Sequence, residues 1–95
     1  MSDVVYELLA TEVARDKLAA RNISAPEVEQ VPRNEHRIVR NPHEDREPGQ
    51  RRLLVGETDG GRVLTLVIER TVDPTTWLVV TGWSATAAER KLLRG

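Results

Sequence analysis

The fold is decided by the segment Arg52-Leu-Leu-Val-Gly-Glu-Thr-Asp-Gly-Gly-Arg-Val-Leu-Thr-Leu-Val-Ile-Glu-Arg70. Two β-rich runs in it flank Thr58-Asp-Gly-Gly61. Asp-Gly-Gly readily adopts the positive φ angles that a tight hairpin turn requires. The segment therefore predicts two antiparallel neighbouring strands, with Gly60 or Gly61 at positive φ.

A third β-rich run, Trp77-Leu-Val-Val-Thr-Gly-Trp83, follows after Asp73-Pro74 and extends the hairpin to a meander. Alternate side chains of a strand point to opposite faces of a sheet. On the middle strand, this alternation places Leu64, Leu66 and Ile68 opposite Val63, Thr65, Val67 and Glu69. On the last strand, it places Leu78 and Val80 opposite Trp77, Val79, Thr81 and Trp83. We expect helices on the aliphatic face and a candidate site on the second, half-polar face.

The first half of the chain predicts a strand, two helices and a further strand. Val4 to Leu8 is the expected first strand, and Thr11 caps a helix to about Ala20. The buried stripe of this helix is predicted to hold Val13, Ala14 and Leu18. Ser24-Ala-Pro-Glu27 has the spacing of a capping box, with Pro in the first turn, and predicts a second helix to about Val31 that stops near Pro32.

Three further segments complete the order of elements. His36 to Arg40 is predicted as a strand, and the charged residues 41–49, bracketed by two Pro, as an exposed loop. A C-terminal helix capped by Ser84 or Thr86 is expected to turn Leu92 and Leu93 inward. The predicted class is α+β: an antiparallel meander of about four strands against two N-terminal helices and a short C-terminal helix, in a single domain of residues 1–95.

Composition excludes several classes of protein. The 95 residues, 39% hydrophobic and 31% charged, are enough for one modest core. The chain has no Cys and so no disulfide or thiolate metal site, and a net charge of −1 disfavours a uniformly basic nucleic-acid binder. No apolar run approaches bilayer length, and the N-terminus lacks a signal pattern, so we expect a cytoplasmic protein. All but two of the 14 basic residues are Arg, which reflects genomic base composition or recognition of phosphate.

Three segments resemble BrnT-like toxins of the RelE superfamily: Arg21-Asn-Ile-Ser-Ala-Pro-Glu-Val-Glu29, Arg52-Leu-Leu-Val-Gly-Glu-Thr-Asp-Gly-Gly-Arg-Val-Leu64 and Val79-Val-Thr-Gly-Trp-Ser-Ala-Thr-Ala-Ala-Glu-Arg90. The resemblance implies a RelE-like fold, a type II toxin-antitoxin ribonuclease that needs no metal or cofactor, and a small antitoxin of the ribbon-helix-helix or helix-turn-helix class. Two places depart from the family pattern. Ala20-Arg21-Asn22 stands where Lys-His-Gly is usual, and Trp83-Ser84 stands where the family tends to carry Arg.

Cleavage of RNA by its own 2′-OH requires a proton acceptor and fixed positive charge around the phosphorus. The candidates are, for catalysis, Arg21, Arg52, Glu57 and Arg70 and, for RNA binding, Arg51, Arg62, Trp77 and Trp83. Glu7 is a second candidate base. Ordinary surface positions for the charged residues, and core or antitoxin-interface positions for both Trp, are the alternatives.

The two ends of the predicted hairpin are about 17 Å apart, so one active site cannot include both. We place it at the Arg52 and Arg70 end, because Arg51 adds charge there and Trp77 begins the next strand. His36 and His43 are further candidates for acid or base catalysis, because histidine is the side chain that commonly exchanges a proton near neutral pH, although His43 lies in the charged loop. His36, His43, Glu44 and Asp45 lack diagnostic metal-ligand spacing, so no metal site is predicted.

A different class of function is also compatible with these features. The half-polar sheet face of a non-catalytic interaction domain would bind a peptide or protein partner. The missing family His and the near-zero net charge favour that alternative.

Overall fold

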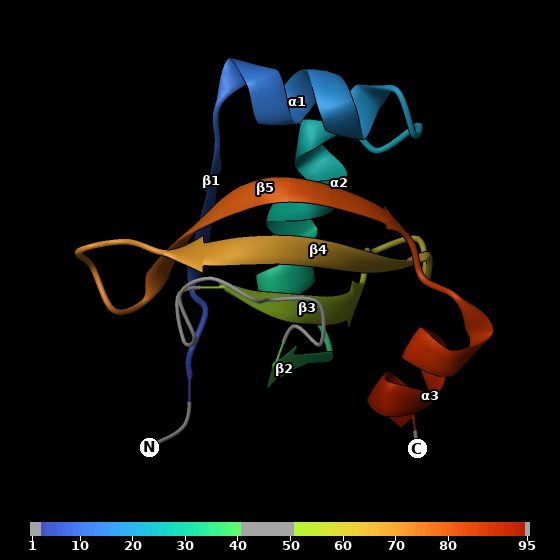
Figure 1. The fold of residues 1–95 in the computed structure, drawn as a ribbon. Helices are drawn as coiled ribbons and strands as arrows, with labels where there is room; N and C mark the ends of the chain where they lie inside the picture. Colours follow the sequence, from blue (N-terminus) through green and yellow to red (C-terminus); the bar gives the residue numbers. More distant parts are fainter. Residues whose placement is uncertain (1–2, 41–50, 95) are drawn as a thin grey trace.

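The computed structural model describes residues 3–40 and 51–94. Its elements are β1 (Glu7–Ala10), α1 (Glu12–Ala19), α2 (Ala25–Gln30), the 3-10 turn η1 (Val31–Arg33), β2 (His36–Arg40), β3 (Arg51–Glu57), β4 (Val63–Arg70), β5 (Thr76–Ser84) and α3 (Ala87–Arg94). Figure 1 shows these elements around a single sheet. The α+β class is confirmed. The loop predicted at 41–49, with His43, Glu44 and Asp45, lies outside the described residues.

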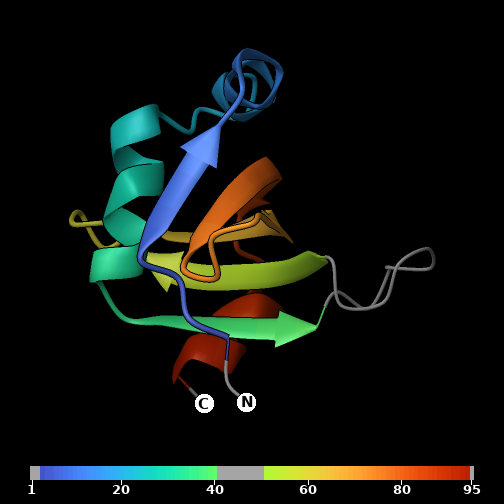
Figure 2. The ribbon, with the colours of Figure 1, turned by 90° about the vertical axis from the view of Figure 1, so that its left-hand side faces the viewer.

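The five strands are arranged in the order β1-β5-β4-β3-β2. β2 to β5 form the predicted antiparallel meander, whereas β1 pairs in parallel with β5 at the opposite edge from β2. The first strand was expected at Val4 to Leu8 and begins later, at Glu7. The helices between β1 and β2 carry the chain from one edge of the sheet to the other, and Figure 2 shows β1 beside α2 with α1 beyond its end.

The hairpin between β3 and β4 has the predicted geometry. Leu54 pairs with Leu66, and Glu57 pairs with Val63 next to the turn. Gly61 has φ 86°, in the region that a residue without a Cβ reaches at little cost. The backbone N–H of Thr58 donates to the Arg62 carbonyl at 2.8 Å and closes the turn.

One face of the sheet carries the main core. Leu64, Leu66 and Ile68 are fully buried there, as the alternation predicts, and pack in one cluster with Leu18 of α1 and Val28 of α2. A second cluster on the other face joins Val55, Val63, Ala85 and Leu93 of α3. Two predicted core positions were wrong: Val13 is 65% exposed and Leu92 is 42% exposed, since only one side of each short helix contacts the sheet.

A bulge in the pairing of β4 with β5 corrects the prediction that Trp77 and Trp83 share a face. Ile68 pairs with Val79 but Val67 pairs with Thr81, so β5 has one additional residue at this point. The insertion shifts the alternation of side chains by one. Trp77 therefore lies in the main core, whereas Trp83 pairs with Thr65 on the face that α3 partly covers.

The helix caps agree with the predicted signals. Thr11 accepts the Ala14 N–H, and Ser24 and Glu27 form a complete capping box. Thr86, rather than Ser84, caps α3, because its hydroxyl accepts the Glu89 N–H at 3.2 Å. The second helix ends near Pro32, as predicted, with Gln30 as its last residue and Val31 as its C-cap. The chain continues from α2 directly into η1, in which Pro occupies the first turn, where its missing N–H costs little.

Candidate functional site

At the end of the hairpin away from the turn, the structure brings Arg52 and Arg70 together through Asp3. Arg52 Nε lies 3.0 Å from one carboxylate oxygen of Asp3, and Arg70 Nη2 lies 2.9 Å from the other. Burial alone would raise the pKa of Asp3, but the hydrogen bonds and charges of both Arg side chains lower it below its usual value. This carboxylate therefore remains ionised and offsets part of the positive charge of the pair.

Trp77 lies beside this pair, as predicted, but inside the core. The Arg70 guanidinium lies 4.9 Å from the centre of its ring, and its indole N–H donates to the Val4 carbonyl at 3.0 Å. Trp77 is only 1% exposed. Its ring therefore presents no open face to a base, which corrects the expected RNA-stacking role. Arg51 is on the other face of β3 and forms an ion pair with Glu69, with 3.0 Å between Arg51 Nε and Glu69 Oε1.

At the turn end, Arg62 connects three parts of the fold. One of its terminal nitrogens donates to the Asn22 carbonyl at 2.6 Å and to Glu27, and the other donates to the Ser84 hydroxyl at 2.7 Å. The hydrogen bond from the backbone N–H of Ser24, the largest contribution, and those from Arg62 lower the pKa of Glu27, so this carboxylate stays charged opposite Arg62. Asn22 has φ 59°, a conformation that Asn and Gly tolerate best.

Arg21 and Trp83 meet at the same end of the sheet. The Arg21 guanidinium lies 6.0 Å from the centre of the Trp83 ring, at the limit of a cation–π contact. Trp83 is partly exposed, and its indole N–H donates to Glu89 at 3.0 Å. The ring is therefore held in a fixed orientation while one part of it remains accessible.

Glu57 and its ion-pair partner Arg94 also lie at the turn end, because Glu57 pairs with Val63 in the hairpin. Glu7, the other candidate base, is exposed on β1 and lies 3.5 Å from the Thr76 hydroxyl. His36 is partly buried, with Nδ1 2.9 Å from the Asn34 carbonyl. Within residues 3–40 and 51–94, no group of three His, Asp or Glu is placed to hold a metal ion.

The predicted site residues thus form two groups. Arg52, Arg70 and Trp77 share one end of the sheet, and Arg21, Glu57, Arg62 and Trp83 share the other. The sequence analysis did not identify two carboxylates that organise these ends. Asp3 carries no motif, and Glu89 stands three residues after Thr86, at the spacing of a capping box, which indicates the start of a helix rather than a site.

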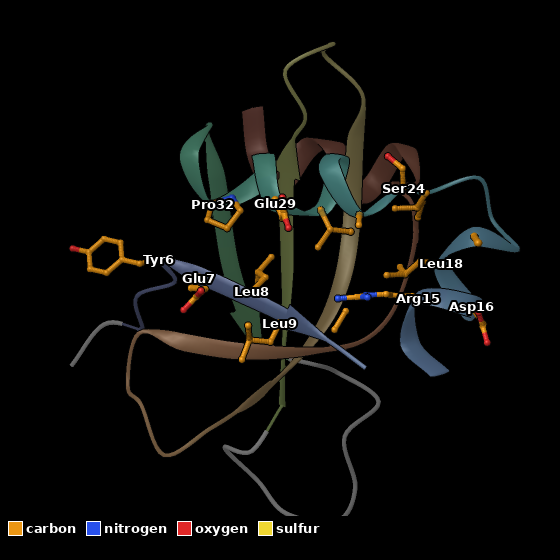
Figure 3. Close-up of a pocket in the computed structure, with 15 residues that line it drawn as sticks. Tyr6, Glu7, Leu8, Leu9, Arg15, Asp16, Leu18, Ser24, Glu29 and Pro32 are labelled. Carbon is orange, nitrogen blue, oxygen red and sulfur yellow. The ribbon is translucent and has the colours of Figure 1, made fainter. Parts of the chain in front are cut away.

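A groove of about 520 Å³ lies between β1, α1 and α2. Figure 3 shows Leu8, Leu9 and Arg15 around it, with Glu29 and Pro32 on the α2 and η1 side. Both Tyr6, just before β1, and Leu9 of β1 line the groove, with 75% and 48% of their surfaces exposed. The outer edge of β1 has no neighbouring strand within the described part of the sheet. Exposed apolar side chains beside an open strand edge are typical of a protein-binding surface.

Comparisons with known proteins agree with this architecture. The DUF4258 family, a domain of unknown function, matches residues 10–82. The chain belongs to this family. None of the curated proteins matches it. Among solved structures, the ribonuclease toxin BrnT of Brucella abortus has a similar fold, with a TM-score of 0.58 and 15% sequence identity, and the match covers 86% of this chain and 99% of that one.

The DUF4258 chain thus has a BrnT-like toxin fold, which the three resembling segments of its sequence predicted. In the described residues, no helix is both long and apolar enough to span a bilayer.

Proposed function

We propose that this DUF4258 protein is a toxin-like, metal-independent ribonuclease of the RelE superfamily. It acts as a single cytoplasmic domain and is neutralised by a small antitoxin. The observation that carries the proposal is the grouping of Arg21, Arg62 and Trp83 at the turn end of a sheet whose fold resembles a ribonuclease toxin. The fold by itself supports only the architecture, so the function depends on this group of side chains.

The proposal places the site at the turn end rather than at the Arg52 and Arg70 end. Asp3 neutralises part of the charge of Arg52 and Arg70 and occupies the space between them. Arg21, by contrast, is exposed beside a partly exposed aromatic ring. An Arg beside an accessible ring combines a phosphate contact with a stacking surface for a base.

Each residue has a distinct role in the proposed reaction. Glu57 accepts the proton of the 2′-OH, the 2′-oxygen forms a bond to phosphorus, and the bond to the 5′-oxygen breaks. The 5′-oxygen takes a proton from solvent, which leaves a 2′,3′-cyclic phosphate and a 5′-hydroxyl. Arg21 stabilises the charge that accumulates on the phosphoryl oxygens. Arg62 positions Arg21, since both of its terminal nitrogens bind groups of the α1–α2 loop.

The test combines growth with RNA cleavage. Expression of the protein alone should arrest cells, and co-expression of the small protein encoded by the neighbouring reading frame should restore growth. Purified protein should cleave RNA in the presence of EDTA, and Arg21→Ala should slow cleavage by about 10²-fold, as expected for loss of one charge-stabilising group. Normal growth at high expression together with no cleavage by the purified protein would refute the proposal.

The second candidate function is a non-catalytic protein-interaction domain. The groove between β1, α1 and α2 favours it, because Tyr6 and Leu9 expose apolar surface beside an open strand edge. This differs from the expectation that the half-polar sheet face would bind the partner. If Leu9→Asp abolishes binding of the neighbouring protein in a protein that never cleaves RNA, the interaction domain is the correct function.

A further inference from the structure

A second groove lies between the turn of the β3–β4 hairpin and α3, with a volume of about 550 Å³. Among residues 3–40 and 51–94, its lining includes four cationic side chains, those of Arg62, Arg90, Lys91 and Arg94, and no carboxylate. Figure 1 shows why these groups meet: β5 leads directly into α3 on the side of the sheet where β3 turns into β4. Of the four, only Arg62 has a role in the proposed reaction, and no sequence motif accounts for such a concentration of positive charge in a chain of net charge −1.

Nearby acidic groups neutralise only half of these cations. Glu27 pairs with Arg62, and Glu57 pairs with Arg94. Arg90 donates to the neutral Ala85 carbonyl at 3.1 Å, and within residues 3–40 and 51–94 Lys91 has neither an ion pair nor a side-chain hydrogen bond. Glu89, the residue before Arg90, is turned away toward Trp83 and Thr65. Two positive charges therefore remain available to a ligand.

The shape and neighbours of the groove indicate an extended polyanion. Arg90 and Arg94 are four residues apart and lie on one side of α3, so positive charge runs along the helix. Trp83 does not line the groove, but its indole N–H donates to Glu89, directly before Arg90, so its partly exposed ring lies beside the first turn of α3 and can stack on a base. A track of cations next to an aromatic ring is the usual arrangement for binding single-stranded nucleic acid.

We infer that the groove between the hairpin turn and α3 binds the sugar-phosphate backbone of single-stranded RNA, with Arg90 and Lys91 contacting phosphates. This deepens the proposed function, since it assigns a path to the RNA outside the reacting bond. The inference does not require that the protein cleaves RNA, because binding of the backbone needs only the positive charge of the groove.

Two Lys variants provide a matched test. Lys91 and Lys17 are the only Lys residues, and both are exposed on helices, but Lys17 lies on α1 outside the groove. The probe is a fluorescein-labelled 2′-O-methyl oligouridylate, which has no free 2′-OH and cannot be cleaved by its own attack. Its affinity for the full chain is measured by fluorescence anisotropy over a range of salt concentrations.

For single strands, each phosphate contact contributes about 0.7 to the slope of log K against log salt, which corresponds to about fivefold in affinity at 0.1 M salt. Lys91→Ala should therefore weaken binding about fivefold and reduce the slope by about 0.7, whereas Lys17→Ala should change neither. Circular dichroism of both variants verifies that α3 is retained.

The inference is overturned if wild-type protein does not bind the probe, if both variants weaken binding equally, or if unlabelled polyglutamate displaces the probe while unlabelled oligouridylate does not. The proposed function is judged separately. Binding that depends on Lys91 without cleavage of ordinary RNA would refute the ribonuclease and retain the groove. Cleavage of RNA together with probe binding that Lys91→Ala leaves unchanged would retain the ribonuclease and refute the groove.

Discussion

The indole N–H of Trp83 donates to the carboxylate of Glu89 at 3.0 Å, and this bond joins the end of β5 to the first turn of α3. The same carboxylate oxygen accepts the Thr86 N–H at 2.8 Å and the Thr65 hydroxyl at 2.9 Å. One side chain thus caps a helix, orients an aromatic ring and fixes α3 to β4. Both the Trp83 surface and one wall of the cationic groove depend on its position.

Replacing Glu89 by Ala should therefore destabilise the protein by about 1–3 kcal/mol, because the cap is lost and two partly buried donors lose their acceptor. Glu12→Ala is the matched control, since Glu12 is an exposed carboxylate in the first turn of α1. Urea unfolding followed by Trp fluorescence measures both variants. Equal stability of the two would show that the Glu89 network contributes nothing beyond helix propensity.

The free energy of unfolding should depend on pH through the ionisation of the Glu89 carboxylate. Burial alone would raise the pKa of Glu89, but hydrogen bonds from Thr86, Trp83 and Thr65 together lower it below its usual 4.5. The unfolded chain therefore takes up the proton first, so the stabilisation is complete above about pH 5.5 and is lost as the pH falls through the folded-state pKa. Asp3, with a pKa below 3.8, acts in the same direction at lower pH.

The measurement is the free energy of unfolding of wild type and Glu89→Gln at stepwise pH. The wild type should be more stable than Glu89→Gln at neutral pH. This difference in the free energy of unfolding should shrink below about pH 4.5, where the Glu89 carboxylate becomes protonated. A constant difference between the two proteins down to pH 3 would contradict the lowered pKa of Glu89.

Local signals in the sequence were sufficient for most of the fold. The Asp-Gly-Gly turn, the capping box at Ser24 and the alternation through Leu64, Leu66 and Ile68 each depend on residues close together in the chain. The parallel pairing of β1 with β5 does not, because it joins residues about seventy positions apart and has no local signature. The bulge opposite Val67 and Ile68 also has no signal in the sequence. Because of it, Trp77 lies in the core rather than at the predicted site.

The candidate site was harder to predict than the fold for a related reason. Sequence analysis can list Arg residues at strand ends, but the charge available at each depends on long-range partners. Asp3 reaches Arg52 and Arg70 from the N-terminal segment, and Glu27 reaches Arg62 from α2. The cationic groove likewise requires α3 to lie beside the hairpin turn, which no spacing within α3 indicates.

Gly82 of β5 should tolerate a larger side chain poorly. A Cβ added there would lie 2.6 Å from Leu66 Cδ2 and 3.0 Å from the Thr65 carbonyl oxygen, and backbone cannot move aside cheaply. Gly82→Ala should therefore cost about 1–3 kcal/mol, as overpacking of a core typically does. At Gly60 the nearest atom is 3.9 Å away, so Gly60→Ala should be close to neutral. Thermal unfolding of both variants tests this, and a wild-type melting temperature for Gly82→Ala would show that Leu66 and the β4 backbone accommodate a Cβ at little cost.

Asp3 and Arg52 provide the test that separates the two ends of the hairpin. Their side chains are only 20% and 17% exposed, so Arg52→Ala should lower the free energy of unfolding by about 1–2 kcal/mol, between the values for exposed and buried ion pairs. Cleavage of RNA per folded molecule should nevertheless remain at the wild-type level in Arg52→Ala, and also in Arg70→Ala. Under the proposal, Arg21→Ala and Arg62→Ala have the opposite profile, with slower cleavage in each. If Arg52→Ala instead abolishes cleavage at a temperature where circular dichroism shows it to be fully folded, the active site belongs at the Asp3 end, and the charge held there by Asp3 serves catalysis rather than stability.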